Sequence, residues 1–252
     1  MKKLVDLILH PTGVAEIIVD RPERHNAMTL PMYQDVLAFV ERCAQDPGVG
    51  AILFRGTGGK SFIAGTDISY FKDFTSGKQG LEYEAFVERV VGAVERIAVP
   101  TIAVIDGWTV GGGLALATVC DFRLCTDSSR FGVPIAKTLS NTLSSLNLAR
   151  LTAGFGLPRV KKMLLLADYI SADEALSCGY AYQVCPREEL ESTAHALAVK
   201  LIGLSSVTQQ AAKESLRRIT VEQNLSDEDL IESVYGSQAF RDGVAAFISP
   251  KK

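Results

Sequence analysis

TIAVIDGWTVGGGLALATV, residues 101–119, carries the clearest structural signal in this chain. Its start, Thr101–Asp106, is strand-like, its end from Leu114 onward is helix-like, and three glycines (residues 111–113) join the two. Glycines at the start of a helix leave backbone N–H groups uncovered, at the end of the helix that carries partial positive charge. Such a turn can bind an anion, or a carbonyl oxygen that gains negative charge during a reaction.

A second glycine turn, FIAGTD at residues 62–67, also follows a predicted strand. N–H groups from both turns that point at one oxygen would form an oxyanion hole. The pattern leaves an alternative open, in which the glycines serve only tight turns and close packing of helix against strand.

Strand-like segments recur along the chain and are separated by helix-sized intervals. The predicted strands are 13–20, 49–54, 101–106, 121–126 and 180–185. The predicted helices are 29–46, 81–97, 111–120, 143–153, 158–166, 172–177, 188–201, 207–219 and 227–240, with one more helix junction at 240–243. This alternation predicts an α/β core with parallel strands, covered faces and right-handed crossovers, followed by a helical C-terminal portion.

The composition excludes several classes of function. The 252 residues are 47% hydrophobic and 22% charged with a net charge of -3, and this slight acidity argues against a nucleic-acid partner. No apolar run reaches the length of a membrane span, and Asp6, His10 and Pro11 interrupt the apolar core that a signal peptide needs. The five cysteines lack CxxC spacing and the three histidines lack helical pairing, so we expect reduced thiols in a cytoplasmic protein and no metal site.

Counting excludes two nucleotide-binding motifs and one hydrolase motif. Gly59-Lys60-Ser61 resembles the end of a P-loop, but Phe54 stands where that motif requires its first glycine. The glycines between 107 and 113 do not have GxGxxG spacing, and the chain contains no GxSxG sequence. Nucleotide-dependent and serine-hydrolase chemistry therefore lack support.

Six short segments, taken in order, give the chain a resemblance to a known family. They are RPERHNAM at 21–28, AGTD at 64–67, GGGL at 111–114, FGVP at 131–134, AAKES at 211–215 and AFRDGVAAF at 239–247. Over nearly its whole length the chain resembles the enoyl-CoA hydratase/isomerase (crotonase-like) family. The resemblance implies an α/β fold in which ββα units form a right-handed superhelix with the acyl-CoA site, over residues 1–195. It also implies a C-terminal helical region, 196–252, that builds homotrimers, some of them dimers of trimers.

The resemblance also implies roles for particular residues. Family members bind acyl-CoA thioesters, with coenzyme A as part of the substrate and no separate cofactor, and stabilise an enolate or related oxyanion. Matching motif to motif places the two donors at the backbone N–H groups of Thr66 and Gly112. Donors fixed in a dry site stabilise the developing charge without reorganisation, each by on the order of 3 kcal/mol. Because these donors are backbone groups, the side chain at position 66 is not the working part.

Contacts to coenzyme A and the acyl group carry over by the same matching. The residues implied are Arg24, Asn26, Ala27, Ala64, Gly65, Asp67, Ile68, Trp108, Gly111, Pro134, Ile135 and Lys213. Four of them have an ordinary structural alternative: a solvated surface charge for Arg24 and Lys213, helix capping for Asp67 and core packing for Trp108.

The chain departs from the family pattern at two positions. Family hydratases position and activate water with two glutamates, and Ala115 and Ile135 stand in their places here. Apolar side chains cannot transfer a proton, so hydration by the usual pair is excluded. Polar residues then replace a glycine-rich turn of the hydratases, and Ser140 and Asn141 either lie beside the acyl group or cap the next helix.

We therefore expect an acyl-CoA enzyme of this family, with isomerase-type or other enolate chemistry favoured over standard hydration. One alternative is an acyl-CoA decarboxylase similar to methylmalonyl-CoA decarboxylase, a relative that also lacks the glutamate pair. Another is a non-catalytic protein that binds CoA thioesters.

Overall fold

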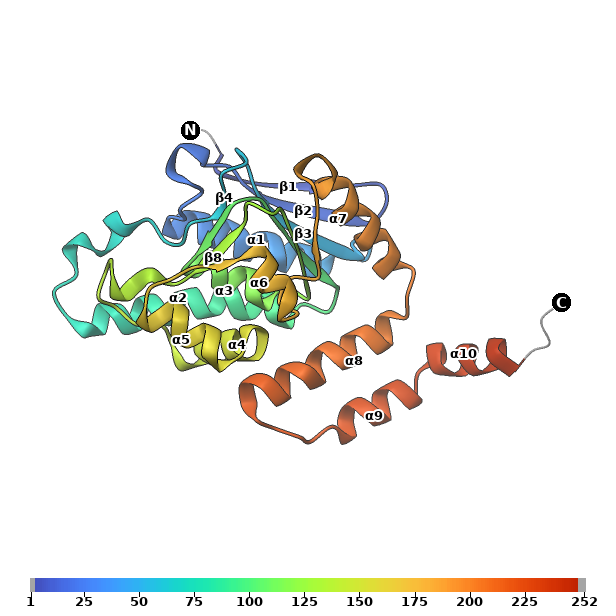
Figure 1. Ribbon diagram of the computed structural model, residues 1–252. Coiled ribbons are helices and arrows are strands. Elements are labelled where there is room, and N and C mark those ends of the chain that lie inside the picture. Colours follow the sequence, from blue (N-terminus) through green and yellow to red (C-terminus); the bar gives the residue numbers. More distant parts are fainter. Residues whose placement is uncertain (1–2, 249–252) are drawn as a thin grey trace.

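Two β-sheets form the body of the protein in a computed structural model that describes residues 3–248 (Figure 1). The larger sheet has the strand order β1-β2-β3-β5-β7-β10, and the smaller has the order β4-β6-β8-β9. The strands are β1 Val5–Leu9, β2 Val14–Val19, β3 Ala51–Gly56, β4 Ser61–Ile63, β5 Thr101–Ile105, β6 Trp108–Val110, β7 Phe122–Cys125, β8 Arg130–Gly132, β9 Ile170–Ser171 and β10 Gln183–Val184.

Helices connect and cover these strands. The α-helices are α1 Leu30–Gln45, α2 Gly77–Arg96, α3 Gly112–Val119, α4 Ser145–Phe155, α5 Leu157–Leu165, α6 Ala172–Ser177, α7 Arg187–Ile202, α8 Ser206–Arg217, α9 Glu228–Tyr235 and α10 Gln238–Ile248. Short helical turns lie at η1 Pro22–Arg24, η2 Ile68–Asp73, η3 Pro134–Ala136 and η4 Arg218–Glu222. No helix within residues 3–248 combines the length and the apolarity that crossing a membrane requires.

Strands are used in pairs, one for each sheet. β3, β5 and β7 lie parallel in the larger sheet, while β4, β6 and β8, which directly follow them, lie parallel in the smaller sheet. α2 follows the first pair and α3 the second, so a ββα unit repeats along the chain. The parallel strands predicted from sequence are confirmed, whereas the β1–β2 and β8–β9 pairs are antiparallel.

The two faces of the larger sheet are covered by different helices. Because side chains alternate along a strand, Ile17 and Val19 of β2 join the core with α1, α2 and α3, while Val14 joins a second core. In that second core α7 contributes Leu190, Ala194, Ala198 and Leu201. A domain boundary at residue 195 would therefore divide a helix that packs on the sheet as one unit. The outer ends of the two ranges expected for the domains, residues 1–2 and 249–252, lie outside the described residues.

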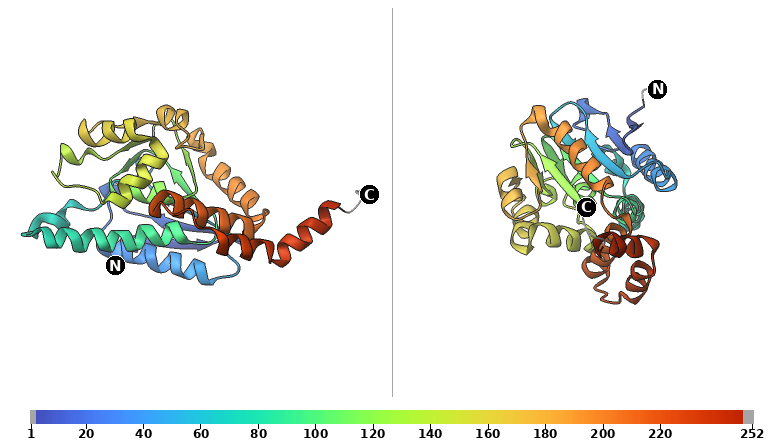
Figure 2. Two further views of the ribbon diagram at one scale, coloured as in Figure 1. Left: turned by 90° about the horizontal axis from the view of Figure 1, so that it is seen from below. Right: turned by 90° about the vertical axis from the view of Figure 1, so that its right-hand side faces the viewer.

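The last three helices follow the two sheets in the chain: α8 lies beside the body of the protein, and α10 reaches away from it (Figure 2). None of them contains a buried residue, although each has an apolar face. The expectation of one helix over 227–240 is wrong: α9 ends at Tyr235 and α10 runs from Gln238 through Gly243. The junction predicted at 240–243 thus lies at Gly236–Ser237.

Candidate functional site

The two glycine turns meet in space, and each presents an unpaired backbone donor. Met28 holds the first turn, because its N–H donates to the Gly65 carbonyl (2.8 Å) and its carbonyl accepts from the Asp67 N–H (2.9 Å). The Thr66 N–H, between these two bonds, takes no part in the pairing. The second donor is the N–H of Gly112, which begins α3 and so has no carbonyl one turn earlier. Within residues 3–248 neither N–H has a hydrogen-bond acceptor.

The glycines allow the two turns to approach without side chains between them. Gly65 has a φ of +87°, and a Cβ there would lie 3.2 Å from the Val110 carbonyl and 3.7 Å from the Gly112 nitrogen. A Cβ at Gly113 would collide with the Ile63 carbonyl oxygen of β4. Close packing, the alternative left open by the sequence, is therefore present, and it is what brings the two turns together.

A cavity of about 320 Å³ opens where the turns meet. The predicted site residues that line it are Ala64, Gly65, Thr66, Ile68, Gly111, Gly112, Pro134, Ile135 and Asn141. Ala115, which stands in place of a family glutamate, is buried and does not line the cavity. The remaining lining residues, none of which was singled out as a site residue, are Phe71, Tyr83, Glu84, Val110, Thr138, Leu139 and Leu143.

A chain of hydroxyl groups lies behind the first turn. The Thr66 Oγ1 is 3.0 Å from the Tyr33 Oη and 2.5 Å from the Tyr83 Oη. Tyr33 is fully buried, and burial raises its pKa; burial likewise raises the pKa of Tyr83 to about 12. Both tyrosines are therefore neutral near pH 7, and their hydroxyl groups fix the position of the Thr66 hydroxyl.

Glu84, on α2, is the only carboxylate among the described residues that line the cavity. It is half-buried. Burial raises its pKa, the backbone N–H of Ser144 lowers it in part, and the nearby Glu88 carboxylate raises it again, so the net shift is upward. No motif marks this residue, because it is one of several glutamates in an amphipathic helix.

Side chains of the segment 21–28 stabilise the loops around the cavity. The buried Asn26 amide donates to the Thr57 and Ser61 carbonyls, and its oxygen accepts from the Arg21 N–H. The Arg21 guanidinium donates to the Ala27 carbonyl (2.9 Å) and to Asp67 (2.7 Å). These internal bonds use both amide donors of Asn26 and one of the two lone pairs on its oxygen.

Asp67 has the capping role that was the alternative to ligand contact. Its carboxylate accepts from the Ser69 hydroxyl and backbone N–H and so begins η2. The Ser69 bonds and the Arg21 guanidinium lower the pKa of Asp67 to about 2.

Several predicted contacts lie elsewhere. Trp108 is 41% exposed and packs edge-on against Tyr169, 4.7 Å between ring centroids, so the wall position expected for it is not observed. Lys213 is also displaced: its ammonium donates to Asp121 (2.6 Å) and to the Val99 carbonyl (2.8 Å), which ties α8 to the core. These acceptors use two of the three donors of the Lys213 ammonium group, and its contact with a CoA phosphate stays a prediction.

Two other expected contacts are exposed. Arg24 lies on the surface at the end of η1, and Ser140 is exposed with a φ of +54° and does not line the cavity, unlike its neighbour Asn141.

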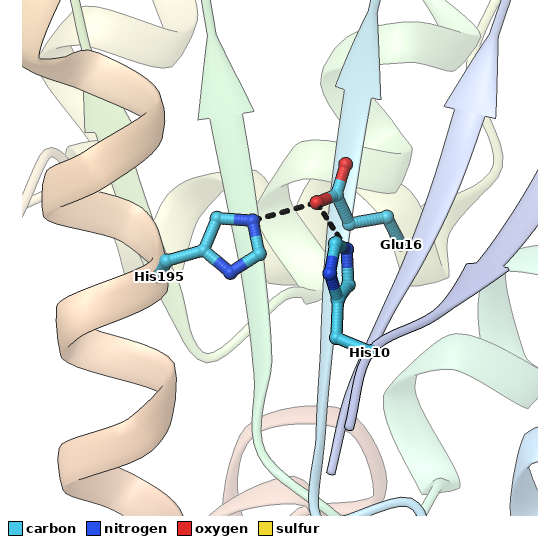
Figure 3. Close-up of side chains that lie close together, drawn as sticks. All are labelled: His10, Glu16 and His195. Carbon is cyan, nitrogen blue, oxygen red and sulfur yellow. Dashed lines mark hydrogen bonds and ion pairs between the residues drawn. The ribbon is translucent and has the colours of Figure 1, made fainter. Parts of the chain in front are cut away.

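Three potential metal ligands meet on the face of the larger sheet that α7 covers: His10 and Glu16, which are close in sequence, and the distant His195 (Figure 3). The Nε2 atoms of His10 and His195 lie 2.7 and 2.6 Å from the same Glu16 oxygen. Zinc with bonds of about 2.0–2.2 Å in tetrahedral geometry would hold its ligand atoms roughly 3.3 Å apart. The observed spacings are those of hydrogen bonds, and the Arg55 Nε binds the second Glu16 oxygen at 2.9 Å.

The Glu16 cluster thus joins β2, β3, α7 and the residue that follows β1 through hydrogen bonds. Burial alone would raise the pKa of Glu16, but Arg55 and the two histidines together lower it. The expectation that the chain has no metal site stays a prediction.

Comparisons with known proteins agree on one family. The family model described as enoyl-CoA hydratase/isomerase matches residues 10–252. A short-chain-enoyl-CoA hydratase of Clostridium acetobutylicum is 29% identical, covering 99% of this chain and 97% of the relative. A probable enoyl-CoA hydratase of Mycobacterium bovis is 30% identical, covering 97% of this chain and 95% of the relative.

Solved structures show the same likeness. The crystal structure of an enoyl-CoA hydratase/carnithine racemase from Magnetospirillum magneticum superposes with a TM-score of 0.88 at 27% identity, covering 98% of this chain and 93% of the other. The motif order, the meeting of the two glycine turns and these likenesses lead to one conclusion: this chain belongs to the enoyl-CoA hydratase/isomerase family of acyl-CoA enzymes.

Proposed function

We propose that this enzyme forms a thioester enolate from an acyl-CoA and uses it to shift a carbon–carbon double bond. The unpaired N–H groups of Thr66 and Gly112 at one cavity carry the proposal. Two such donors at one thioester oxygen would act as an oxyanion hole, strongest in a site from which water is excluded. The acyl-CoA would enter as substrate, with Ala64, Gly65 and Ile68 along its path.

Standard hydration is disfavoured by the residues present. It would need two acid/base groups beside the double bond, and Ala115 and Ile135 supply none. Moving a proton from one carbon to another needs only one group that first accepts and then returns it. The cavity offers one carboxylate, which matches this requirement.

Decarboxylation is disfavoured by charge. An acyl group with its own carboxylate would need a cation or several donors, yet no lysine, arginine or histidine is among the described residues that line the cavity. Of the two polar residues expected beside the acyl group, Asn141 lines the cavity and Ser140 does not. A non-catalytic CoA-binding role is the third possibility, and turnover separates it from the other two.

The donor at Gly112 can be tested with a matched pair of variants. Gly112→Pro removes the N–H at the first position of α3, where helices tolerate proline. Gly112→Ala keeps the N–H, and both variants bring the same Cβ toward the Tyr33 hydroxyl. We expect the proline variant to be at least about 100-fold slower than the alanine variant in converting 3-hexenoyl-CoA to 2-hexenoyl-CoA.

Equal rates for the two variants would show that the Gly112 N–H does not stabilise the oxyanion. Crotonyl-CoA and methylmalonyl-CoA, assayed in parallel, report hydration and decarboxylation. Binding of all three thioesters without turnover of any would favour the non-catalytic alternative.

We also propose the assembly and location that the resemblance implied. The C-terminal helices would build a homotrimer, and two such trimers could pair into a dimer of trimers. Within each chain the ββα units would wind into a right-handed superhelix, the hand that parallel crossovers prefer. A cytoplasmic location stays a prediction from the cysteine pattern.

A further inference from the structure

We propose that Glu84 is the catalytic acid/base, which takes a proton from C2 of the acyl chain and returns it to C4. This assignment rests on the function proposed above, because it requires a thioester oxygen held by the N–H groups of Thr66 and Gly112. It replaces the two absent family glutamates with one residue from a different element, α2.

The position of Glu84 between two cavities supports this role. Thr66 and Gly112, which carry the two N–H donors, line the cavity of about 320 Å³, and neither residue lines a neighbouring cavity of about 430 Å³. Glu84 lines both, together with Phe71, Tyr83, Leu139 and Asn141. An acyl chain that starts at the donors and extends into the second cavity passes this boundary with the carbons that follow its carbonyl. Glu84 thus lies beside the part of the substrate that must exchange a proton.

Other polar groups on the wall cannot take the proton. Asn141 is an amide, and Thr66 and Thr138 are alcohols, none of which accepts a proton near neutral pH. Tyr83, with a pKa raised to about 12 by burial, is also neutral there. A carboxylate in a partly apolar site is the group that can both accept a proton and release it.

The reaction balances without any further reactant. Glu84 breaks the C2–H bond of a 3-enoyl thioester and keeps the proton, while the electron pair moves toward the carbonyl oxygen to give a dienolate. The carbonyl then reforms, the double bond moves to C2–C3, and C4 takes the proton back from Glu84. One proton changes carbon, and the carboxylate is restored.

The walls indicate the chemical class of the acyl group. The second cavity is lined by the apolar residues Phe71, Phe74, Leu81 and Leu139, so an unbranched hydrocarbon tail would bury apolar surface there. A second carboxylate on the acyl group would instead lie near the Glu84 charge. We therefore assign the substrate class as 3-enoyl-CoA thioesters with an apolar tail.

Glu84→Gln keeps the size of the side chain and removes the carboxylate that can accept and return a proton. Glu82→Gln is the matched control, because Glu82 is exposed on the same helix and does not line the cavity. Three quantities are measured: isomerisation of 3-hexenoyl-CoA, exchange of the C2 protons of butyryl-CoA in D₂O by NMR, and affinity for butyryl-CoA by calorimetry. We expect Glu84→Gln to lose isomerisation and exchange by about 10²–10⁴-fold while the Kd stays within threefold. The Glu82→Gln variant should match the wild type.

The exchange measurement separates the two levels of the proposal. Wild-type protein that neither exchanges nor isomerises would contradict the proposed function, and with it this assignment. Wild-type exchange that Glu84→Gln keeps to within threefold would overturn the Glu84 assignment alone.

Glu84→Asp tests the same assignment if the Glu84→Gln variant fails to fold. It retains the carboxylate one methylene further back, and we expect reduced but measurable exchange with an unchanged Kd. Exchange as fast in Glu84→Asp and Glu84→Ala as in the wild type would likewise overturn the assignment.

Discussion

Thr66 combines a structural side chain with a functional backbone. Its hydroxyl joins the hydroxyls of Tyr33 and Tyr83, while its N–H, on a residue that lines the cavity, has no acceptor within residues 3–248. A substitution at Thr66 should therefore change stability more than catalysis, because it removes the hydroxyl and leaves the backbone N–H in place.

Thr66→Ala should lower the free energy of unfolding by about 1–2 kcal/mol, because the buried Tyr33 hydroxyl loses its partner. Turnover should fall by less than about tenfold, since the backbone donor remains. Thr66→Ser, which keeps the hydroxyl, is the control. Urea unfolding and steady-state kinetics measure the two effects, and a loss of several orders of magnitude in kcat would show that the hydroxyl takes part in the reaction.

The raised pKa of Glu84 predicts a pH profile. As a base Glu84 must be ionised, so kcat/KM should fall as pH decreases through a value above the ordinary 4.5. The titratable groups that face it are Glu88 on its own helix, which is paired with Arg150 of α4, and the neutral Tyr33 and Tyr83. A profile that is flat down to pH 4.5 would contradict the shift.

The same shift gives Glu84 a stability signature. The folded state holds this proton to higher pH than the unfolded state, so stability falls as pH rises between the two pKa values. Glu84→Gln should remove that decrease, and urea unfolding of both proteins across this pH window measures it.

At the scale of elements, α2 is positioned by an ion-pair cluster with α4. The Arg150 guanidinium, 4% exposed, lies 2.7 Å from both Glu88 and Glu95. Two of its nitrogens donate to each carboxylate. Hydrogen bonds to both carboxylates outweigh the effect of burial and raise the pKa of Arg150. Glu84 lies one turn before Glu88 on the same helix, so this cluster also helps to orient the cavity wall.

Arg150→Met should lower the free energy of unfolding by about 3–5 kcal/mol, because it leaves two partly buried carboxylates without a cation. The triple variant with Glu88→Gln and Glu95→Gln should recover much of that loss. Urea unfolding at one protein concentration compares the three proteins. A loss below about 1 kcal/mol in Arg150→Met would mean that water replaces the guanidinium.

Helices with several turns in period were predictable, and the three-residue strands of the smaller sheet were not. α1, α2 and α7 have apolar residues at helical spacing over several turns, and their predicted bounds agree with the structure to within a few residues. β4, β6 and β8 have three residues each, too few to show a period of two. These strands form because they pair with one another in the smaller sheet, and the local sequence contains no signal for them.

For the molecule as a whole, the C-terminal helices lack enough contacts within one chain. Leu216 is 64% and Phe247 91% exposed, and a cavity of about 430 Å³ between α8 and α10 is lined by Val207, Phe240 and Val244 among other apolar residues. Apolar surface of this extent on helices without buried residues is typical of a subunit interface.

We expect light scattering to give three times the 27.2 kDa chain mass, or six times for a dimer of trimers. Phe240→Asp combined with Val244→Asp should shift the mass toward one chain, because charges would enter the apolar interface. Glu228→Gln, at an exposed polar position on α9, should not. A wild-type protein with the mass of a single chain would contradict the trimer.

Local sequence determined the α/β class, the two glycine turns and the absence of the family glutamates. These features depend on the backbone freedom of glycine, on hydrophobic periodicity and on residue identity, all of which can be read within a few residues. Only the tertiary structure placed Glu84 at the cavity, Lys213 on Asp121, and His10 beside His195 on Glu16. Those neighbours come from helices and strands far apart in the chain, and how such elements pack on one another depends on the core that they jointly bury.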